Sequence, residues 1–470
     1  MNILSKLSHL DIAVFIGIMV AFVMMIVVMK FSRISANLLQ SLAAGRALTL
    51  PIFVVTLVAS WYGNVIGATQ IAFRHGIYNF FALGACWYIS AIVFAYFISN
   101  KLVQSDSLSL PEIVGKLHGK TSEKIILMMM VMKTLPLTYI MALSIIITSL
   151  FGLDQKIVFL MVGVLGVLIS LRTSLKSVIA IDLIQFFSIF IGLGLMVYFC
   201  YHKLGGHEYL VQNLPPKHLE VTGDNSVYKL ILWFLVAFST TALSPIFHQR
   251  CFAAKSTKVA KLGIVISVIF WMISDILTTL GGLYARSIYT ASSDISSTNT
   301  HHAFLELITQ VLPEGLIGYM MAAIAITSIS ALDSHIFATK TLVINHCKSY
   351  RLLSSPRFSN FIGALIIVIT TIIAIKLDGD IEKAWLLFES AFIASVLIPV
   401  LLSIYGKKLI SSWQFNSVIL ITFPLVAWSD YYFLSHNSTL NLLGLLFNFS
   451  FILMCIVYNK AKNKPIYINS

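Results

Sequence analysis

Hydroxyl and carboxyl side chains interrupt the apolar segment between residues 314 and 342. Four of them are spaced at i, i+3, i+6 and i+7, which places them on one face of a helix: Thr327, Ser330, Asp333 and Ser334. Oxygen atoms of hydroxyl and carboxyl groups can replace the hydration shell of a hard cation. The alternative is structural, since serine and threonine hydroxyls also bond the carbonyl groups of their own helix. An acidic residue inside an apolar segment favours the first interpretation, a cation-binding face.

The segment from Ala59 to Gln70 carries glycines and amides in the middle of an apolar stretch. Gly63, Asn64 and Gly67 weaken a helix at this point. Unwound backbone inside a membrane is tolerated beside protein or a water-filled cavity, and its free carbonyl groups can bind a cation. The same small residues would also allow close packing between helices, which is the structural alternative.

Further ionisable residues lie inside other apolar segments. Asp182 is followed by Gln185 in one segment, and Asp275 and Glu389 lie in two others. Lys133 stands three residues before Pro136, where a helix kink is expected. Charged groups inside a membrane are costly, so these residues are candidates either for a functional site or for a structural ion pair that includes Lys133.

The composition indicates that helices crossing a lipid bilayer position these side chains. Hydrophobic residues make up 58% of the chain and charged residues only 11%, against roughly a quarter in soluble domains. We predict an all-α membrane protein with about thirteen transmembrane helices, at residues 11–31, 51–73, 78–100, 123–150, 156–172, 177–200, 228–247, 262–284, 314–342, 358–376, 383–405, 412–433 and 438–458. The longer polar stretches between them, 201–227 and 285–313, are predicted to be connecting loops.

The basic residues are scattered over the short loops, which argues against nucleic-acid binding despite a net charge of +13. With the N-terminus outside, the inward loops hold twenty-one lysines and arginines, Arg250 among them, and the outward loops hold nine. This asymmetry agrees with the positive-inside rule. We therefore expect a plasma-membrane protein, in the inner membrane of a bacterium, with its C-terminus in the cytoplasm.

Motifs of soluble catalysis are absent from the sequence. It contains no Gly-rich phosphate loop, no HExxH and no GxSxG. The five cysteines lack the spacing of a disulfide framework or a metal site. We predict that the protein is not an enzyme and has neither a cofactor nor a transition-metal site.

Five short motifs resemble those of the sodium/solute symporter family, whose members carry proline, sugars, pantothenate and sialic acid. Residues 59–76 resemble the broken second helix of the family and the turn after it, and residues 107–112 resemble its loop before the fourth helix. Residues 178–185 resemble an Asp-x-x-Gln segment, and residues 249–256 resemble the loop after helix seven. Residues 330–335, Ser-Ala-Leu-Asp-Ser-His, resemble the Ser-[Ser/Thr]-x-Asp-Ser-Gln motif of helix nine.

The resemblance implies two inverted five-helix repeats, helices 2–6 and 7–11, at about 51–200 and 228–405. The segments 11–31, 412–433 and 438–458 are then peripheral helices.

The resemblance also implies a Na⁺ site between backbone carbonyl groups of the second helix, near Leu57 and Ser60, and the Ser330 hydroxyl, with Ala323 nearby. The family's second hydroxyl position is Ala331 here, which supplies no ligand oxygen. Thr327, one turn earlier, offers a substitute. In some relatives a second cation lies near the positions of Asp182, Asp333 and Ser334. We expect Na⁺ coupling, with a proton on a buried carboxylate as the alternative.

The resemblance places solute contacts on helices two, four, seven and eleven. The matched residues are Trp61, Asn64, Gln70, Lys133, Phe238, Ser239, Thr240, Thr241 and Glu389. Their aromatic, amide, hydroxyl and charged groups suit a small polar organic solute. The expected function is cation-coupled symport of such a solute by alternating access. The alternatives are proton-coupled symport and a membrane sensor that keeps the fold without uptake.

Overall fold

The computed structural model describes residues 3–31, 48–63, 65–107, 109–171, 175–223, 225–289, 297–347, 356–377, 381, 389, 391–433 and 439–461. Within these ranges the chain is almost entirely helical, and an isolated β-bridge joins Leu48 to Ala254. Backbone polar groups inside a bilayer must be satisfied within the protein, and a helix does this within one segment. The predicted all-α class is confirmed.

The described helices follow one another with mostly short connections. In chain order they are η1 (Ile3–Lys6), α1 (His9–Phe31), α3 (Leu50–Trp61), α4 (Val65–His75), η3 (Phe80–Ala85), α5 (Cys86–Val93), η4 (Phe94–Ile98), α6 (Ser99–Gln104), α7 (Leu110–His118), α8 (Lys120–Lys133), α9 (Leu137–Phe151), α10 (Gln155–Ser170), α11 (Leu175–Lys203), α12 (His207–Asn213), η5 (Pro216–Leu219), α13 (Val227–Ala242), α14 (Pro245–Ala253), α15 (Thr257–Ser287), α16 (Ser297–Val311), α17 (Leu316–Cys347), α18 (Pro356–Lys376), α20 (Leu397–Ile404), α21 (Ser412–Phe433) and α22 (Thr439–Ala461).

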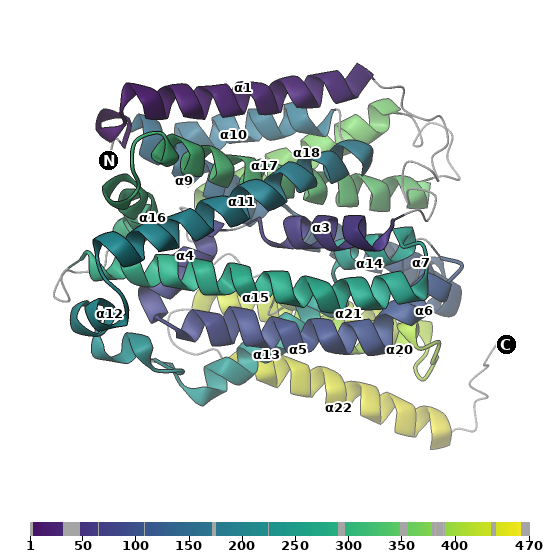
Figure 1. Ribbon diagram of the computed structural model, residues 1–470. Coiled ribbons are helices and arrows are strands. Elements are labelled where there is room, and N and C mark those ends of the chain that lie inside the picture. The colour runs from purple at the N-terminus through teal and green to yellow at the C-terminus, as the bar shows by residue number, and fades with distance from the viewer. Residues whose placement is uncertain are drawn as a thin grey trace.

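Figure 1 shows these helices packed side by side, with α1 along one edge of the bundle and α22 along the opposite edge. The central helix is α17, because 89% of its membrane-length stretch is buried, against 11% for α1. Large apolar side chains such as Ile16, Met24 and Trp428 are exposed on the outside of the bundle, as expected where lipid surrounds a protein. The start of α1 and the end of α22 lie at opposite ends of the bundle.

The protein is a multi-pass membrane protein. Six described helices are long and apolar enough to cross a membrane, and eight spans result when each bent pair of helices is taken as one. Three shorter apolar helices accompany them, at Gln155–Ser170, Asn360–Lys376 and Leu446–Asn459. That the chain has about thirteen transmembrane helices stays a prediction.

Two stretches that we predicted as plain loops contain helices. Residues 201–227 include α12 and η5, and residues 285–313 contain α16. Phe304, Leu307 and Ile308 bury one face of α16, which packs against α4 and α15. The apolar pattern of α16 is shorter than a membrane span, so a search for spans alone does not find it.

Two spans bend sharply near their middle. The break between α3 and α4 bends the chain by 57°, as the glycines of this segment predict. The break between α13 and α14 bends it by 42°, and we did not predict it. Ser244 caps α14 by accepting the Phe247 N–H at 3.3 Å, and Pro245 occupies the first turn. The kink expected near Pro136 is present as the short gap between α8 and α9.

Candidate cation and solute sites

Asp182 of α11 is a fully buried carboxylate next to hydroxyl groups from two other helices. Ser330 and Ser334, one turn apart on α17, lie 2.8 and 3.5 Å from its Oδ1 atom. Ser60, in the last turn of α3, lies 3.4 Å from Oδ2 and 3.3 Å from the Ser334 hydroxyl. The structure thus brings four predicted cation ligands into one group, called the Asp182 cluster below: Ser60, Asp182, Ser330 and Ser334.

The other side of the carboxylate faces an arginine. Nη2 of Arg250 donates to Ser60 Oγ at 2.9 Å and lies 3.3 Å from Asp182 Oδ2, with only 1% of its side chain exposed. The prediction that Arg250 lies in a loop is therefore wrong, since it is a buried residue of α14. Helix α14 continues past the break and carries the guanidinium into the protein. Among the described residues, the Nε and Nη1 atoms of Arg250 have no hydrogen-bond partner.

The Asp-x-x-Gln segment ties α11 to the helix break. Gln185, nearly one turn after Asp182, donates from Nε2 to the carbonyl oxygen of Ala59 at 3.0 Å. The last carbonyl groups of a helix lack partners within that helix, so this side chain satisfies one of them. Helix α11 also packs against both α3 and α17. One short stretch of α11 therefore contacts both elements that were expected to bind a cation.

The face of α17 that carries Ala331 packs directly on the break. A methyl group added at Gly63 would lie 2.0 Å from Ala331 Cβ and 2.8 Å from a ring carbon of Tyr139. Thr327, about one turn earlier, donates to the carbonyl oxygen of Ala323 at 2.7 Å. A bond from a threonine hydroxyl to a carbonyl group of its own helix is the structural alternative to cation binding. The lone pairs of the hydroxyl oxygen nevertheless remain available to a cation.

The two other predicted cation ligands are also buried. Asp333 is 3% exposed and lies close enough to Asp182 for their charges to interact. Leu57, predicted to contribute a backbone carbonyl group, is 1% exposed in the last turns of α3. Both residues therefore lie in the protein interior, near the elements that form the cluster.

Replacement of Gly63 by alanine should destabilise the protein by about 1–3 kcal/mol, because the new methyl group overlaps Ala331. The loss is measurable by thermal unfolding of the purified protein. Gly17→Ala is the matched control, since nothing lies within 4 Å of a methyl group there. Adding Ala331→Gly to Gly63→Ala should restore part of the stability. Equal stability of Gly63→Ala and the parent would contradict this packing.

A cavity lies near the cluster, and four of the predicted solute residues line it: Trp61, Lys133, Thr240 and Glu389. Nζ of Lys133 lies 2.7 and 2.6 Å from the two carboxylate oxygens of Glu389. Their side chains are 3% and 9% exposed. Tyr139 and His335, with ring centroids 4.7 Å apart, complete a mixed aromatic and polar wall. A cavity of this kind suits a small solute with polar groups.

The other predicted solute residues that the structure describes do not line this cavity. Gln70 is buried and donates to Thr300 of α16 at 3.4 Å. Thr241 bonds a carbonyl group of its own helix, Ser239 is fully buried, and Phe238 packs against the hydrophobic core. Asn64 lies outside the described residues.

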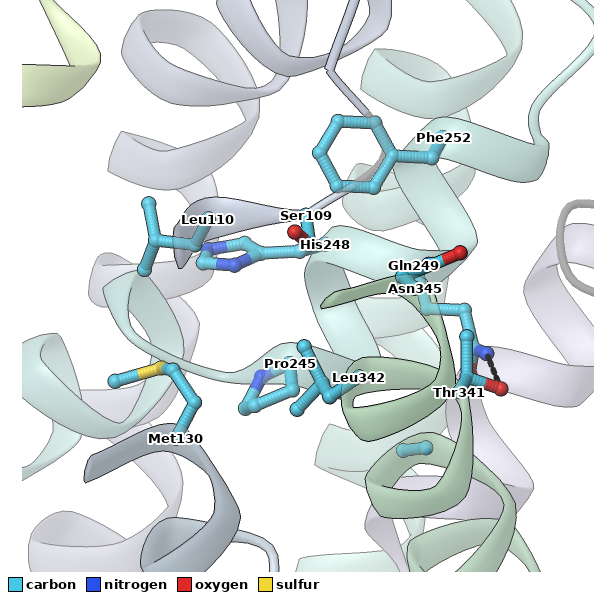
Figure 2. Close-up of a pocket in the computed structure, with 11 residues that line it drawn as sticks. Ser109, Leu110, Met130, Pro245, His248, Gln249, Phe252, Thr341, Leu342 and Asn345 are labelled. Carbon is cyan, nitrogen blue, oxygen red and sulfur yellow. Dashed lines mark hydrogen bonds between the residues drawn. The ribbon is translucent and has the colours of Figure 1, made fainter. Parts of the chain in front are cut away.

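Figure 2 shows a second cavity between α7, α8, α14 and α17. Met130, Pro245 and Leu342 form part of its apolar wall, and Gln249 donates to Thr341 at 3.5 Å on its polar side. No predicted cation or solute residue is among those that line it. This cavity therefore adds no predicted ligand to either site.

Comparison with known proteins agrees with the helical membrane fold. The profile of the Sodium:solute symporter family matches residues 41–420. The chain therefore belongs to this family, a class of membrane transporters and not of enzymes. It is 24% identical over 284 residues to the sodium/glucose cotransporter of Vibrio parahaemolyticus, and the match covers 54% of this chain and 52% of that protein. The chain thus matches about half the length of this curated relative.

Solved structures share the fold. A Na⁺-coupled sialic acid symporter in a substrate-bound outward-open state superposes with a TM-score of 0.74, 15% identity, and 97% and 99% coverage of the two chains. A manganese transporter of Eremococcus coleocola superposes with a TM-score of 0.56, 10% identity, and 93% and 97% coverage. At these identities the likeness concerns the fold alone.

Proposed function

We propose that the protein is a secondary active symporter that uses inward Na⁺ flow to take up a small polar organic solute. The observation that carries the proposal is the Asp182 cluster, a buried carboxylate with serine hydroxyls beside a helix break. Carboxylate and hydroxyl oxygens suit a hard cation. Ionisable groups inside a membrane mark ion pathways by default. Membership of the Sodium:solute symporter family supports Na⁺ as the ion.

In this proposal Na⁺ binds on the Oδ1 side of Asp182, together with the hydroxyl oxygens of Ser330 and Ser334. Arg250 remains on the Oδ2 side, so the ion need not displace it. Thr327 and the carbonyl groups near Leu57 would supply further oxygens in place of the hydroxyl that Ala331 lacks. Asp333 would lower the electrostatic potential around the site.

Coupling would follow from the helices that meet at the cluster. A cation that bridges α3, α11 and α17 stabilises the arrangement in which these helices are close, and its release favours another arrangement. The proposed inverted repeats, at about 51–200 and 228–405, would each begin with a bent span, α3–α4 and α13–α14. Alternating access would then move one repeat against the other around a central site.

The solute would bind in the cavity beside Lys133 and Glu389. Opposite charges, hydroxyl groups and aromatic rings line this cavity, which favours a small molecule with polar groups over an apolar one. We further propose that the protein lies in the plasma membrane of a bacterium, with its N-terminus outside and its C-terminus in the cytoplasm. The asymmetric distribution of basic residues in the sequence supports this orientation.

Proton-coupled symport is the second candidate, because the two acids Asp182 and Asp333 interact in the same buried region. Desolvation and a neighbouring negative charge both favour protonation of a carboxylate. Na⁺ remains the first candidate, since the break and the serine hydroxyls would have no role in a purely proton-coupled site.

Counterflow of radiolabelled solutes in proteoliposomes tests the proposed function. Sugars, amino acids and carboxylates are screened with Na⁺ and pH gradients varied separately. Accumulation that requires Na⁺ supports the proposal. Accumulation that follows pH and ignores Na⁺ would replace it with proton coupling. Specific solute binding without any accumulation would favour a sensor.

Ala331→Ser should raise the apparent Na⁺ affinity, because it adds a hydroxyl to the face that packs on the break. The expected gain is about three- to tenfold, the effect of one additional oxygen ligand worth roughly 1 kcal/mol. Ala338→Ser, seven residues along α17 and also buried, is the matched control and should leave the affinity unchanged. Unchanged affinity in Ala331→Ser would show that Na⁺ does not approach this face.

A further inference from the structure

A second carboxylate is enclosed by aromatic rings on the other side of Trp61. Asp275 of α15 lines a cavity together with three tryptophans and two tyrosines: Trp61, Trp87, Trp271, Tyr62 and Tyr88. These residues are called the aromatic cage below. Asp275 is 8% exposed, and Trp271 is 2% exposed. Helices α3, α5 and α15 each contribute to the cage, so the folded bundle assembles it from distant parts of the chain.

Two tyrosine hydroxyls contact the carboxyl group of Asp275. Tyr62 donates its hydroxyl to Oδ1 at 2.7 Å, and Tyr88 donates to Oδ2 at 2.6 Å. When the acid is ionised, both of its oxygens accept these hydroxyl protons, and the Tyr62 hydroxyl also lies 2.8 Å from Thr278 Oγ1. Gly84 leaves room for the contact between Tyr88 and Asp275, since a methyl group at Gly84 would lie 2.8 Å from the Tyr88 hydroxyl oxygen and 3.3 Å from Asp275 Oδ2.

When ionised, Asp275 has no cationic side chain beside it among the described residues. The ion pairs found among the described residues involve other acids, and none includes Asp275. A buried charge without a counter-charge is costly, and two neutral hydroxyl donors compensate only in part. Asp182 and Glu389, in contrast, each face a basic residue. A ligand that brings a positive charge would complete the site at Asp275.

Aromatic rings around a carboxylate favour an organic ammonium group. The faces of tryptophan and tyrosine attract a cation through their ring quadrupoles. The rings of Trp61 and Trp271 lie with centroids 6.1 Å apart, tilted by 45°. The indole N–H of Trp271 has no hydrogen-bond partner among the described residues, so it can donate to an oxygen atom elsewhere on a solute whose ammonium group lies in the cage. We propose that the aromatic cage binds the ammonium group of a cationic or zwitterionic solute.

The inference rests on the proposed symport, because it names the chemical class of the transported solute. Trp61 lines both the cage and the cavity of Lys133 and Glu389. One solute could therefore place its ammonium group at Asp275 and its remaining polar groups on the other side of the indole.

Two pairs of probes with matched size test the cage on the purified full-length protein. Choline is compared with 3,3-dimethylbutan-1-ol, and ethanolamine with propan-1-ol, by calorimetry and by tryptophan fluorescence. In at least one pair the cation should bind about ten- to a hundredfold more tightly than its neutral partner. No preference in either pair would overturn the inference.

Variants assign the preference to the cage. Asp275→Asn should lose most of the preference for cations. Asp11→Asn should keep this preference, because Asp11 is buried too but accepts from backbone N–H groups next to the starts of α1 and α17. Trp271→Leu removes one aromatic wall without changing charge and should weaken cation binding about two- to thirtyfold. If Asp275→Asn does not fold, Trp271→Leu alone tests the assignment. Full preference in either cage variant would contradict the assignment.

Binding of radiolabelled Na⁺ to the same preparations separates this inference from the proposed function. Na⁺ binding without preference for the cationic probes would remove the cage inference alone. Preference for the cations without Na⁺ binding would remove Na⁺ coupling and leave the cage.

Discussion

Asp182→Asn should abolish Na⁺ binding and also destabilise the protein by about 3–5 kcal/mol. The amide supplies no negative charge for Na⁺, and it leaves Arg250 buried without its counter-charge. Breaking a buried pair by removal of one partner is much more costly than replacing both partners. Equilibrium binding of radiolabelled Na⁺ and thermal unfolding of the same preparation measure the two effects.

The double variant Asp182→Asn with Arg250→Gln separates the two roles. It should recover much of the lost stability, because no unpaired charge remains, and it should still fail to bind Na⁺. Arg250→Gln alone should make the protein more stable in Na⁺ than in a bulky organic cation, since Na⁺ can then neutralise Asp182. Na⁺ binding by the double variant at the parent level would remove Asp182 from the cation site.

Lys133→Met should destabilise the protein by about 3–5 kcal/mol and abolish solute counterflow. The change leaves Glu389 buried in the cavity without its partner at 2.6 Å. Adding Glu389→Gln should restore stability but not transport, if the two charges contact the solute. Unfolding measurements and counterflow are made on the same proteoliposome preparations.

The Lys6–Glu306 pair is the matched control for this prediction. Its atoms lie 3.3 Å apart, but the two side chains are 45% and 19% exposed. Lys6→Met should therefore change stability by no more than about 1 kcal/mol and leave transport intact. Recovery of transport in the variant with both Lys133→Met and Glu389→Gln would show that the pair is only structural.

Local patterns in the sequence predicted the elements of the Asp182 cluster. The glycines around residue 63 indicated the break between α3 and α4, and hydroxyl spacing placed Ser330 and Ser334 on one face of α17. Both features follow from rules that act over one or two helical turns. That Asp182 lies against this face came from resemblance to a family, since no local rule brings α11 to α17.

The residues that sequence reasoning missed depend on contacts between distant segments. From the sequence, we placed Arg250 in a loop with other basic residues. We did not recognise the break at Ser244 and Pro245, so we did not predict helix α14. A serine followed by proline was the available signal for that break. The aromatic cage gave no comparable signal, since Tyr88 and Asp275 are separated by 187 positions and meet only in the folded bundle.

Equilibrium binding of radiolabelled Na⁺ to the purified protein tests the central claim most directly, because it requires no knowledge of the solute. The proposal predicts saturable binding in the parent, weaker binding in Ser330→Ala and none in Asp182→Asn. The Ser330 variant loses one hydroxyl at 2.8 Å from the carboxylate, while the Asp182 variant loses the charge itself. Absence of saturable binding in the parent, or equal binding in Asp182→Asn, would contradict a Na⁺ site at this cluster.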